Sequence, residues 1–460
     1  MNNNIEDIQV KRSDKLEFKR NEFFLNPSNR KYDRQYFSMY QYRLNILKDR
    51  VIQQAMTKWG DGTKKIDGQT IIKQDKILDI TSNQLCWVVG TVFCDYPFKL
   101  NILSDVEKGT DDILPITPSS YLEDFKDSIV MIEDESGRAI LHGDESFLNK
   151  NLLVTGCIVA ILGIEIQAGI FEIMDIAYPK SISQNQNQNQ VNSSGKIALI
   201  SGLNIGFEDD LRIELLKQYL IGELGNNDDK EFNSEIESLI IAGNSILPFE
   251  NLEAENDLKN FITSNNYGSK NISKYNSDSL KKLDNLLTDL LINLKVMVMP
   301  GVNDPAEISL PQQPLHKSLF KNNLMFLDTN RLQRLTNPQW FEINNLKILG
   351  TSGQNIDDVK RYCSKISSLQ IMKSNIYWQN FIPTAPDTLY CYPYENEDPF
   401  VFQELPNVYF VGNQEKYESE MLEYQNNKIR LISLPKFSET GEFVILDLET
   451  LNTEVIKIDL

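Results

Sequence analysis

Hydrophobic and polar residues repeat along the chain with two different periods, and the change falls near residue 70. Before it, large apolar residues recur every three to four positions from Tyr36 to Trp59, which predicts an amphipathic helix ended by Gly60 and Gly62. After it the period is two, and short strands are expected at residues 70–72, 86–93, 129–133, 139–143, 152–161 and 169–178. Such a succession of short strands, separated by Gly and Asp turns, predicts a small closed barrel of the OB type.

A run of alternating Gln and Asn from Gln184 to Gln190 interrupts this pattern. Beyond it, apolar strands alternate with helical stripes. Helices are expected at 208–224 and 280–294, and strands at 197–202, 239–244, 296–299, 346–350, 408–411, 429–434, 443–448 and 454–458. The second half of the chain is therefore predicted to form an α/β sandwich with a predominantly β end, packed on the barrel in a mixed α+β protein.

The chain is expected to have four parts. Residues 1–35 are polar and basic and predict a flexible N-terminal arm, residues 36–182 the helix and OB-fold domain, residues 183–195 a Gln/Asn-rich linker, and residues 196–460 the α/β domain, with a polar insertion at 253–276. Between Lys11 and Arg50, eleven Lys/Arg residues outnumber five Asp/Glu. A nucleic-acid-binding or partner-binding arm is one interpretation, and a solvated tail is the favoured one.

The acidic charge of the barrel favours a protein ligand over a nucleic acid. The chain has a net charge of −19, and residues 86–180 contain six Lys/Arg against sixteen Asp/Glu. Affinity for nucleic acid comes largely from Lys and Arg that neutralise phosphates, and OB barrels that bind single strands use basic grooves with aromatic platforms. We therefore expect a protein-binding barrel without strong direct DNA binding. No secretory signal and no apolar stretch of about 20 residues is found, so an intracellular chain without a membrane anchor is expected.

Cysteine and histidine are too sparse to favour metal chemistry. The five cysteines, which lie in apolar runs without a Cys-x-x-Cys pair, predict buried reduced thiols: Cys86, Cys94, Cys157, Cys363 and Cys391. The chain has only two histidines, His142 and His316, although imidazole is the commonest metal ligand. His316 has no accompanying nucleophile motif, so a structural, hydrogen-bonded role is expected for it. No cofactor and no metal are expected, and no phosphate-binding Gly-x-x-x-x-Gly-Lys loop is present.

Polar residues follow several of the predicted strands, at the sheet edge where open α/β sheets bind ligands. The loops read Ser-Gly-Leu-Asn at 201–204, Gly-Asn at 243–244, Gly-Val-Asn-Asp at 301–304 and Gly-Asn at 412–413. They resemble the metal-binding strand ends of calcineurin-like phosphoesterases, which read Asp-x-His, Gly-Asp, Gly-Asn-His-Asp/Glu and Gly-His-x-His. The candidate site therefore consists of degenerate former metal-site positions: Gly202, Asn204, Asn244, Val302, Asn303, Asp304 and Asn413.

The substitutions at these positions argue against catalysis. Two divalent ions close together need bridging carboxylates to offset their repulsion and imidazoles to complete their coordination. By the resemblance, asparagines replace the histidines and the bridging aspartate, while Gly202 and Val302 offer no ligating side chain. Asp304 keeps a carboxylate, but the resemblance makes it an orienting acid and not a direct ligand. The prediction is an inactive phosphoesterase-like domain with no catalytic residues.

Further motifs carry a more specific resemblance. The chain resembles the B-subunits of replicative DNA polymerases, in the branch of the second, regulatory subunit of polymerase delta, in a fungal form. The motifs lie at residues 133–138, 155–156, 163–165, 169–171, 202–204, 300–305, 310–316 and 383–394, and the likeness runs from about Tyr36 to Leu460. It implies an OB-fold domain packed on an inactive phosphoesterase domain.

The resemblance also implies a role. Such a subunit is a noncatalytic scaffold that joins the cysteine-rich C-terminal domain of the delta catalytic subunit to the third, clamp-binding subunit. It supports processive DNA replication and repair in the nucleus, and in fungi it is shared with the catalytic subunit of the translesion polymerase zeta. Two alternatives remain open on the residues alone: a residual metal-dependent phosphoesterase, which would need ligands that the loops lack, and a single-strand DNA-binding OB protein, which the charge of the barrel disfavours.

Overall fold

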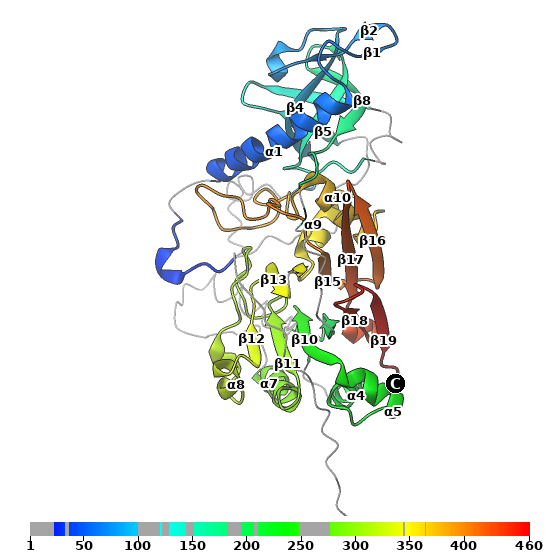
Figure 1. Ribbon diagram of the computed structural model, residues 1–460. Coiled ribbons are helices and arrows are strands. Elements are labelled where there is room, and N and C mark those ends of the chain that lie inside the picture. The colour runs from blue at the N-terminus through cyan, green and yellow to red at the C-terminus, as the bar shows by residue number, and fades with distance from the viewer. Residues whose placement is uncertain are drawn as a thin grey trace, which may run out of the picture.

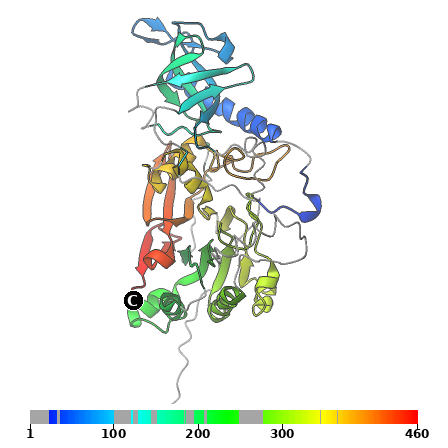
Figure 2. The ribbon, with the colours of Figure 1, turned by 180° about the vertical axis from the view of Figure 1, so that it is seen from behind.

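The chain folds into an OB barrel at one end and a two-sheet α/β unit at the other (Figures 1 and 2). The computed structural model describes residues 23–32, 36–99, 120–121, 128–143, 151–182, 184, 195–206, 210–247, 277–343, 346–363 and 365–460. The expected insertion at 253–276, most of the Gln/Asn run and the first 22 residues lie outside these ranges. Among the described helices, none combines the length and the apolar character that crossing a bilayer requires.

The barrel confirms the OB prediction. Its strands follow the order β3-β4-β5-β6-β8-β7, and an antiparallel pairing of β4 with β7 closes it. The strands are β3 (Ile72–Lys73), β4 (Leu85–Asp95), β5 (Ile129–Glu133), β6 (Arg138–His142), β7 (Ile158–Gln167) and β8 (Ile170–Ala177). A small hairpin, β1 (Lys65–Ile66) with β2 (Gln69–Thr70), and the 3-10 turn η1 (Pro27–Asn29) precede the barrel, and the 3-10 turn η2 (Ile77–Asp79) lies between β3 and β4.

One predicted strand of the barrel is wrong at its beginning. A strand was expected from residue 152, but β7 begins at Ile158. Residues 154–157 instead form a turn, in which the Cys157 amide donates to the Val154 carbonyl (3.3 Å) and Gly156 has a φ of +91°. The apolar residues of this turn are buried all the same, which is why the hydrophobic pattern alone extended the strand over them.

The predicted amphipathic helix is confirmed as α1 (Phe37–Lys58). Its buried stripe repeats every four residues and consists of Met39, Arg43, Leu47, Val51 and Ala55. The C-terminal part of the stripe, from Leu47 to Ala55, packs on the outer wall of the barrel. There β4 and β7 contribute Trp87, Val89, Ala160 and Leu162. The helix therefore covers one side of the barrel, and its N-terminal half extends towards the second domain (Figure 1).

The second domain consists of two stacked sheets. The first has the order β12-β11-β10-β9-β18-β19 and the second β13-β14-β15-β17-β16. The first contains β9 (Lys196–Ile200), β10 (Ile236–Ala242), β11 (Lys295–Met299), β12 (Leu332–Arg334), β18 (Glu442–Asp447) and β19 (Thr453–Lys457). The second contains β13 (Gln339–Ile343), β14 (Leu346–Thr351), β15 (Val408–Gln414), β16 (Glu418–Tyr424) and β17 (Asn427–Pro435).

Helices cover the outer faces of both sheets. Apolar residues of the two inner faces, such as Leu199 and Phe410, form the core between the sheets. The outer face of the first sheet packs mainly against α4 (Leu211–Ile221) and α7 (Ser277–Leu291), beside α5 (Asn227–Ser234), α8 (Leu324–Asp328) and the turns η5 (Lys317–Leu319) and α11 (Phe437–Thr440). On the other sheet, α9 (Gln354–Tyr362) and α10 (Ser368–Trp378) lie between the sheet and the barrel (Figures 1 and 2).

Part of the expected N-terminal arm is ordered against the second domain. Phe23 is fully buried and stacks on Phe400 at a ring distance of 6.4 Å, so the prediction of a flexible arm up to residue 35 is wrong at this point. Gln313 holds the same stretch, because its Oε1 accepts from the Leu25 amide (2.9 Å) and its Nε2 donates to the Phe23 carbonyl (3.1 Å). An apolar anchor outweighs the polar composition around it.

The expected linker is also fixed at Gln184, near its beginning. Gln184 is buried, and its Nε2 donates to the carbonyls of Pro406 (2.9 Å) and Lys428 (2.8 Å). Its Oε1 accepts from the Lys428 amide (3.2 Å). The side chain thus satisfies the hydrogen-bonding needs of backbone groups at Pro406 and Lys428. A low-complexity run can therefore still contribute a residue with a specific structural role.

The barrel and the second domain meet where Gly156 touches the loop after α10. A Cβ atom at residue 156 would lie 2.0 Å from the Pro383 carbonyl oxygen. We expect Gly156→Ala to lower the free energy of unfolding by about 2 kcal/mol, since it adds a steric clash to the cost of a left-handed backbone. Gly169→Ala is the matched control, because Gly169 has a φ of +79° with nothing within 4 Å, and about 1 kcal/mol is expected for it. Equal losses in urea unfolding of the two variants would contradict the close approach.

Candidate functional site

The candidate site lies at the carboxyl ends of β9, β10, β11 and β15. β9, β10 and β11 are parallel neighbours, so the loops that follow them come together at one edge of the first sheet. The chain turns sharply at these strand ends, and the residues with positive φ are Gly202, Asn204, Gly243, Asn244 and Asn413. Gly and Asn are the residues that adopt this conformation at least cost. The sequence prediction that these positions form one cluster is supported by the contacts among them.

Asparagine side chains connect the strand-end loops to one another. The Asn244 Oδ1 accepts from the Asn303 backbone N–H (3.0 Å), and the Asn303 Nδ2 donates to the Asn204 Oδ1 (3.3 Å). The Asn204 Nδ2 in turn donates to the Ser438 Oγ (3.0 Å). Amides both donate and accept, so a chain of them can join loops without any charge. Asn204, Asn244 and Asn303 are three of the predicted former metal-site positions, and here their side chains bind one another's loops.

Asn413 joins a fourth loop to the cluster. Its Nδ2 donates to the carbonyls of Ala242 (3.1 Å) and Ser352 (2.8 Å), and its backbone N–H donates to the Ser201 Oγ (2.8 Å). Gly202 lies against it, because a Cβ atom there would be 3.0 Å from the Asn413 Oδ1 and 2.9 Å from the Lys436 Cα. An aspartate at residue 202 would therefore require the loops to move apart.

Asp304 is the carboxylate of the cluster and is almost fully buried. Its Oδ1 accepts from the amides of Ser245 (2.9 Å) and Ile246 (3.2 Å), and its Oδ2 accepts from the Gly301 amide (2.8 Å). Burial raises the pKa of Asp304 to about 6, and the backbone hydrogen bonds oppose this shift only in part. The side chain thus organises the loops after β10 and β11.

The cluster as a whole is poor in metal ligands. Within the described residues, no group of three or more His, Cys, Asp or Glu side chains is close enough to hold a metal ion. Val302, one of the predicted former metal-site positions, is 67% exposed and presents only methyl groups. Neutral amides and an aliphatic side chain do little to offset the charge of divalent cations. The hydrogen bonds of the cluster fix the loops to one another.

Other residues singled out by the sequence have structural roles. The Nδ1 of His316 caps η5 by accepting from the Ser318 amide (3.2 Å), and the side chain is exposed.

All five cysteines are free, and Cys86, Cys94, Cys157 and Cys391 are buried, while Cys363 is half-buried. Burial raises the pKa of the Cys86 thiol to about 12, which keeps it protonated and unreactive.

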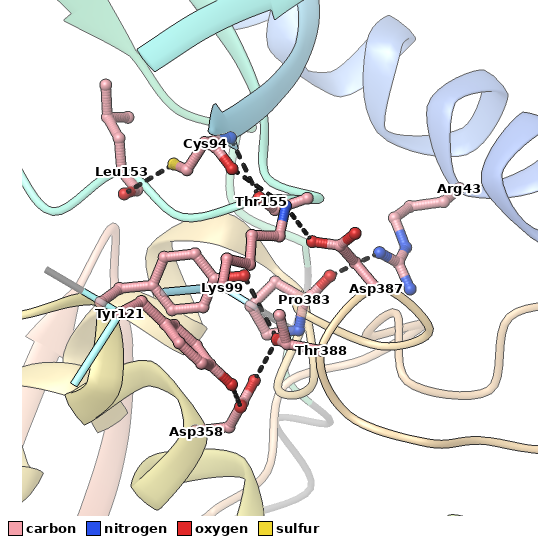
Figure 3. Close-up of polar contacts among 11 residues, drawn as sticks. Arg43, Cys94, Lys99, Tyr121, Leu153, Thr155, Asp358, Pro383, Asp387 and Thr388 are labelled. Atoms are coloured by element: carbon pink, nitrogen blue, oxygen red, sulfur yellow. Dashed lines mark hydrogen bonds and ion pairs between the residues drawn. The ribbon is translucent and has the colours of Figure 1, made fainter. Parts of the chain in front are cut away.

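Sequence reasoning missed a polar cluster between the barrel and the second domain (Figure 3). Arg43 on α1 is fully buried and donates to the Asp398 Oδ2 (2.6 Å) and to the carbonyls of Pro383 (2.7 Å) and Ala385 (2.8 Å). Beside it, Lys99 of the barrel forms an ion pair with Asp387 (2.5 Å). The signal was present in the sequence, because Arg43 stands four residues from both Met39 and Leu47 on the apolar stripe of the helix.

A second part of the same cluster is centred on Asp358 of α9. The Oη of Tyr121 and the Oγ1 of Thr388 each donate to this buried carboxylate at 2.7 Å (Figure 3). Arg361 lies 3.2 Å from it. Residues from the barrel, from α9 and from the loop at 383–394 thus share one hydrogen-bond network, which holds the two domains in one orientation.

Comparison with known protein families agrees with both domains. Residues 35–176 match the model described as the DNA polymerase delta subunit OB-fold domain, and residues 197–419 match the model for the B subunit of DNA polymerases alpha and epsilon. A solved structure described as an archaeal phosphodiesterase aligns with 57% of this chain and 99% of its own length at 16% identity, with a TM-score of 0.26, a value too low to carry an argument.

Curated relatives match over nearly the whole chain. The DNA polymerase delta small subunit of Saccharomyces cerevisiae is 37% identical over 97% of this chain and 94% of its own length. The small subunit of Arabidopsis thaliana is 33% identical over 92% and 91%, and subunit 2 of Drosophila melanogaster is 33% identical over 93% and 94%. With an OB barrel of the expected kind, and with this identity over almost its full length, the chain belongs to the family of DNA polymerase delta small subunits.

Proposed function

We propose that the chain is a noncatalytic scaffold subunit of a DNA polymerase delta complex and acts in the nucleus. The proposal that the chain is noncatalytic rests on the asparagine cluster. The side-chain amides of Asn204, Asn244, Asn303 and Asn413 form hydrogen bonds with one another and with neighbouring loops. A phosphoesterase would need those positions for metal ligands. The accessory role is supported by the small subunits to which the chain is similar.

The partners that we propose are the subunits implied by the resemblance. They are the cysteine-rich C-terminal domain of the delta catalytic subunit, the third, clamp-binding subunit and the catalytic subunit of polymerase zeta. A scaffold that joins other proteins should keep its own domains in a fixed orientation, because relative motion of the domains would separate the surfaces that it presents. The buried contacts of Arg43 and Asp358 between barrel and second domain supply that rigidity.

The test combines assembly with metal analysis. The chain is produced with the cysteine-rich C-terminal domain of the delta catalytic subunit, and the complex is isolated by gel filtration. The chain alone is assayed for bound metal and for phosphodiester hydrolysis with added Mn²⁺. We expect a stable complex, no metal on the chain alone and no turnover. A chain that fails to form the complex, binds about two metal ions and hydrolyses the substrate would be an enzyme and would refute the proposal.

Asn244→Asp is the informative variant for the same assay. The new carboxylate can still accept from the Asn303 amide, so the loop is retained while a bridging ligand is added. No turnover is expected even then, because Gly202 and Val302 still offer no ligand. Metal-dependent hydrolysis that appears with this single change would mean that the remaining residues form a functional site after all.

A further inference from the structure

The outer wall of the barrel has a covered side and an open side. Where β4 and β7 face α1, apolar residues such as Trp87 and Leu162 are buried beneath the helix. On β5, β6 and β8 the side chains that point away from the barrel interior include polar residues such as Arg138 and Glu172, but also Ile129, Ile140 and Met174, which are 41%, 39% and 42% exposed. Outward positions of a solvated antiparallel strand are ordinarily polar. This second apolar side therefore requires an explanation.

The strand register gathers these residues into a continuous row. Phe93 pairs with Met131, Met131 with Ile140, and Ile140 with Ile170, so four apolar side chains lie side by side across β4, β5, β6 and β8. Ile129 lies next to Met131 on the same face of β5, and Met174 lies beyond Glu172 on the same face of β8. We call these six residues the open face. The inward-pointing neighbours on β5 and β6, Ile132 and Leu141, are buried in the barrel, which fixes the direction of the row as outward.

The open face coincides with the wall that OB barrels use for ligands. Counted from β4, the first long strand of the barrel, β5 and β6 are the second and third strands, whose face binds oligonucleotides or oligosaccharides in other OB folds. A single-strand site would offer free aromatic platforms and cations. The ring of Phe93 instead has the Lys99 ammonium 4.1 Å from its centroid and the Arg138 guanidinium at 5.3 Å. The ring therefore already contacts two cations, and Met131, Ile140 and Ile170 complete the row without a further aromatic side chain.

The charges around the open face select the kind of occupant. Asp95 lies beside Ile129 in the register, and Glu172 lies on β8 between Ile170 and Met174, both exposed. Glu133 also borders the row, and it forms an ion pair with Arg138 at 2.8 Å. The border is therefore acidic, as is the barrel as a whole, which has six Lys/Arg against sixteen Asp/Glu over residues 86–180. Such a border repels nucleic acid and a second copy of this chain, whose net charge is −19.

We infer that the open face is a docking surface for a basic amphipathic segment of a partner protein. The apolar side of the segment would cover the row from Met131 to Ile170, and its Lys or Arg residues would meet Asp95 and Glu172. Aliphatic and Met side chains suit such helix-in-groove contacts. The inference assigns a binding surface to the proposed scaffold. It rests on the proposed function in one respect, which is that the occupant is taken to be a protein.

The test uses a defined probe and the full chain. A fluorescent Leu/Lys peptide of about 18 residues, five turns of an amphipathic helix, is titrated with the chain, and binding is followed by anisotropy. Ile140→Asp should weaken binding about tenfold, because it removes apolar contact at the centre of the row. The same change makes the barrel more acidic, so attraction by charge alone would become stronger. Unchanged or tighter binding by Ile140→Asp would therefore overturn the inference.

Two further variants, a peptide of opposite charge and a competitor complete the design. Ile292→Asp alters an isoleucine that is 55% exposed beyond the end of α7, and it should bind the peptide as the unaltered chain does. Met131→Asp, a second change in the row, should repeat the loss seen for Ile140→Asp, which guards against a local folding defect. A Leu/Glu peptide of the same pattern should not bind, and oligothymidine should not compete. Competition by oligothymidine would make the face a nucleic-acid site and refute the inference, while complex formation with the catalytic subunit tests the scaffold role separately.

Discussion

Arg43→Met is expected to lower the free energy of unfolding by about 3–5 kcal/mol, because it leaves the buried carboxylate of Asp398 without its cation. Burial acts to lower the pKa of the Arg43 guanidinium, but the attraction and hydrogen bond of Asp398 outweigh it and raise the pKa above its ordinary value. The carbonyls of Pro383 and Ala385 lose their donors in the same step. Urea unfolding followed by circular dichroism measures the loss.

Two further variants separate charge from packing. In Arg43→Met combined with Asp398→Asn, no buried charge remains, so part of the loss should be recovered. Arg50→Met is the control on the same helix, because Arg50 donates to Gln379 (2.8 Å) and to the Phe402 carbonyl (2.8 Å) without a carboxylate partner. About 1–2 kcal/mol is expected for it. If Arg43→Met were no worse than Arg50→Met, the ion pair would not be what fixes α1 to the second domain.

Arg43 connects the helix on the barrel to the second domain. The helix that carries it is packed on the barrel through Leu47 and Val51, while its guanidinium is bound entirely by the loop at 383–398. A hydrophobic side chain at this position would pack without a preferred orientation. A guanidinium that is hydrogen-bonded to three oxygen atoms instead fixes both the distance and the angle between the helix and the second domain. Fixed orientation is the property that a scaffold for other proteins needs.

Much of the fold followed from periodicity, and the failures have identifiable causes. The helix α1 and the strands β6 and β8 were predictable because each has one buried face, while β4 and β7 are buried on both faces along much of their length and were recognisable as apolar runs bounded by turns. The helices α9 and α10 were missed, although α10 begins with a Ser367-x-x-Gln370 capping box whose reciprocal bonds are 3.1 and 3.3 Å long. Their faces are buried from two sides, by the sheet and by the barrel, so the simple apolar stripe of a surface helix is blurred.

The candidate site was predictable in its location and not in its internal contacts. Strand ends marked by Gly and Asn gave the positions from Gly202 to Asn413, because left-handed turns there have a sequence signature. That the Asn303 amide would reach Asn204, or that Asn413 would bind the Ala242 and Ser352 carbonyls, depends on how strands far apart in the sequence are placed. The same holds for Phe23, which is anchored against Phe400.

Asp304→Asn is expected to reverse a stability cost that the unaltered chain carries at neutral pH. The ordinary pKa of this carboxyl group is 3.8, and burial raises it to about 6 in the folded chain. A raised pKa means that the stability contributed by the protonated group is complete below pH 3.8 and is lost as the pH rises through about 6. The shift of about two units corresponds to about 3 kcal/mol. The Asn variant does not titrate, so it should gain that amount relative to the unaltered chain between pH 4 and pH 7.

The measurement is the difference in unfolding free energy between the two chains across this pH range. Other buried carboxyls with raised pKa, such as Asp357 and Asp387, are present in both chains and cancel. The amide introduced by Asp304→Asn would resemble a protonated carboxyl, since its oxygen still accepts from Ser245 and Ile246 while its nitrogen no longer accepts from Gly301. A difference that stays constant with pH would mean that the backbone donors keep Asp304 ionised despite its burial, and the loops would then be organised around a fixed negative charge.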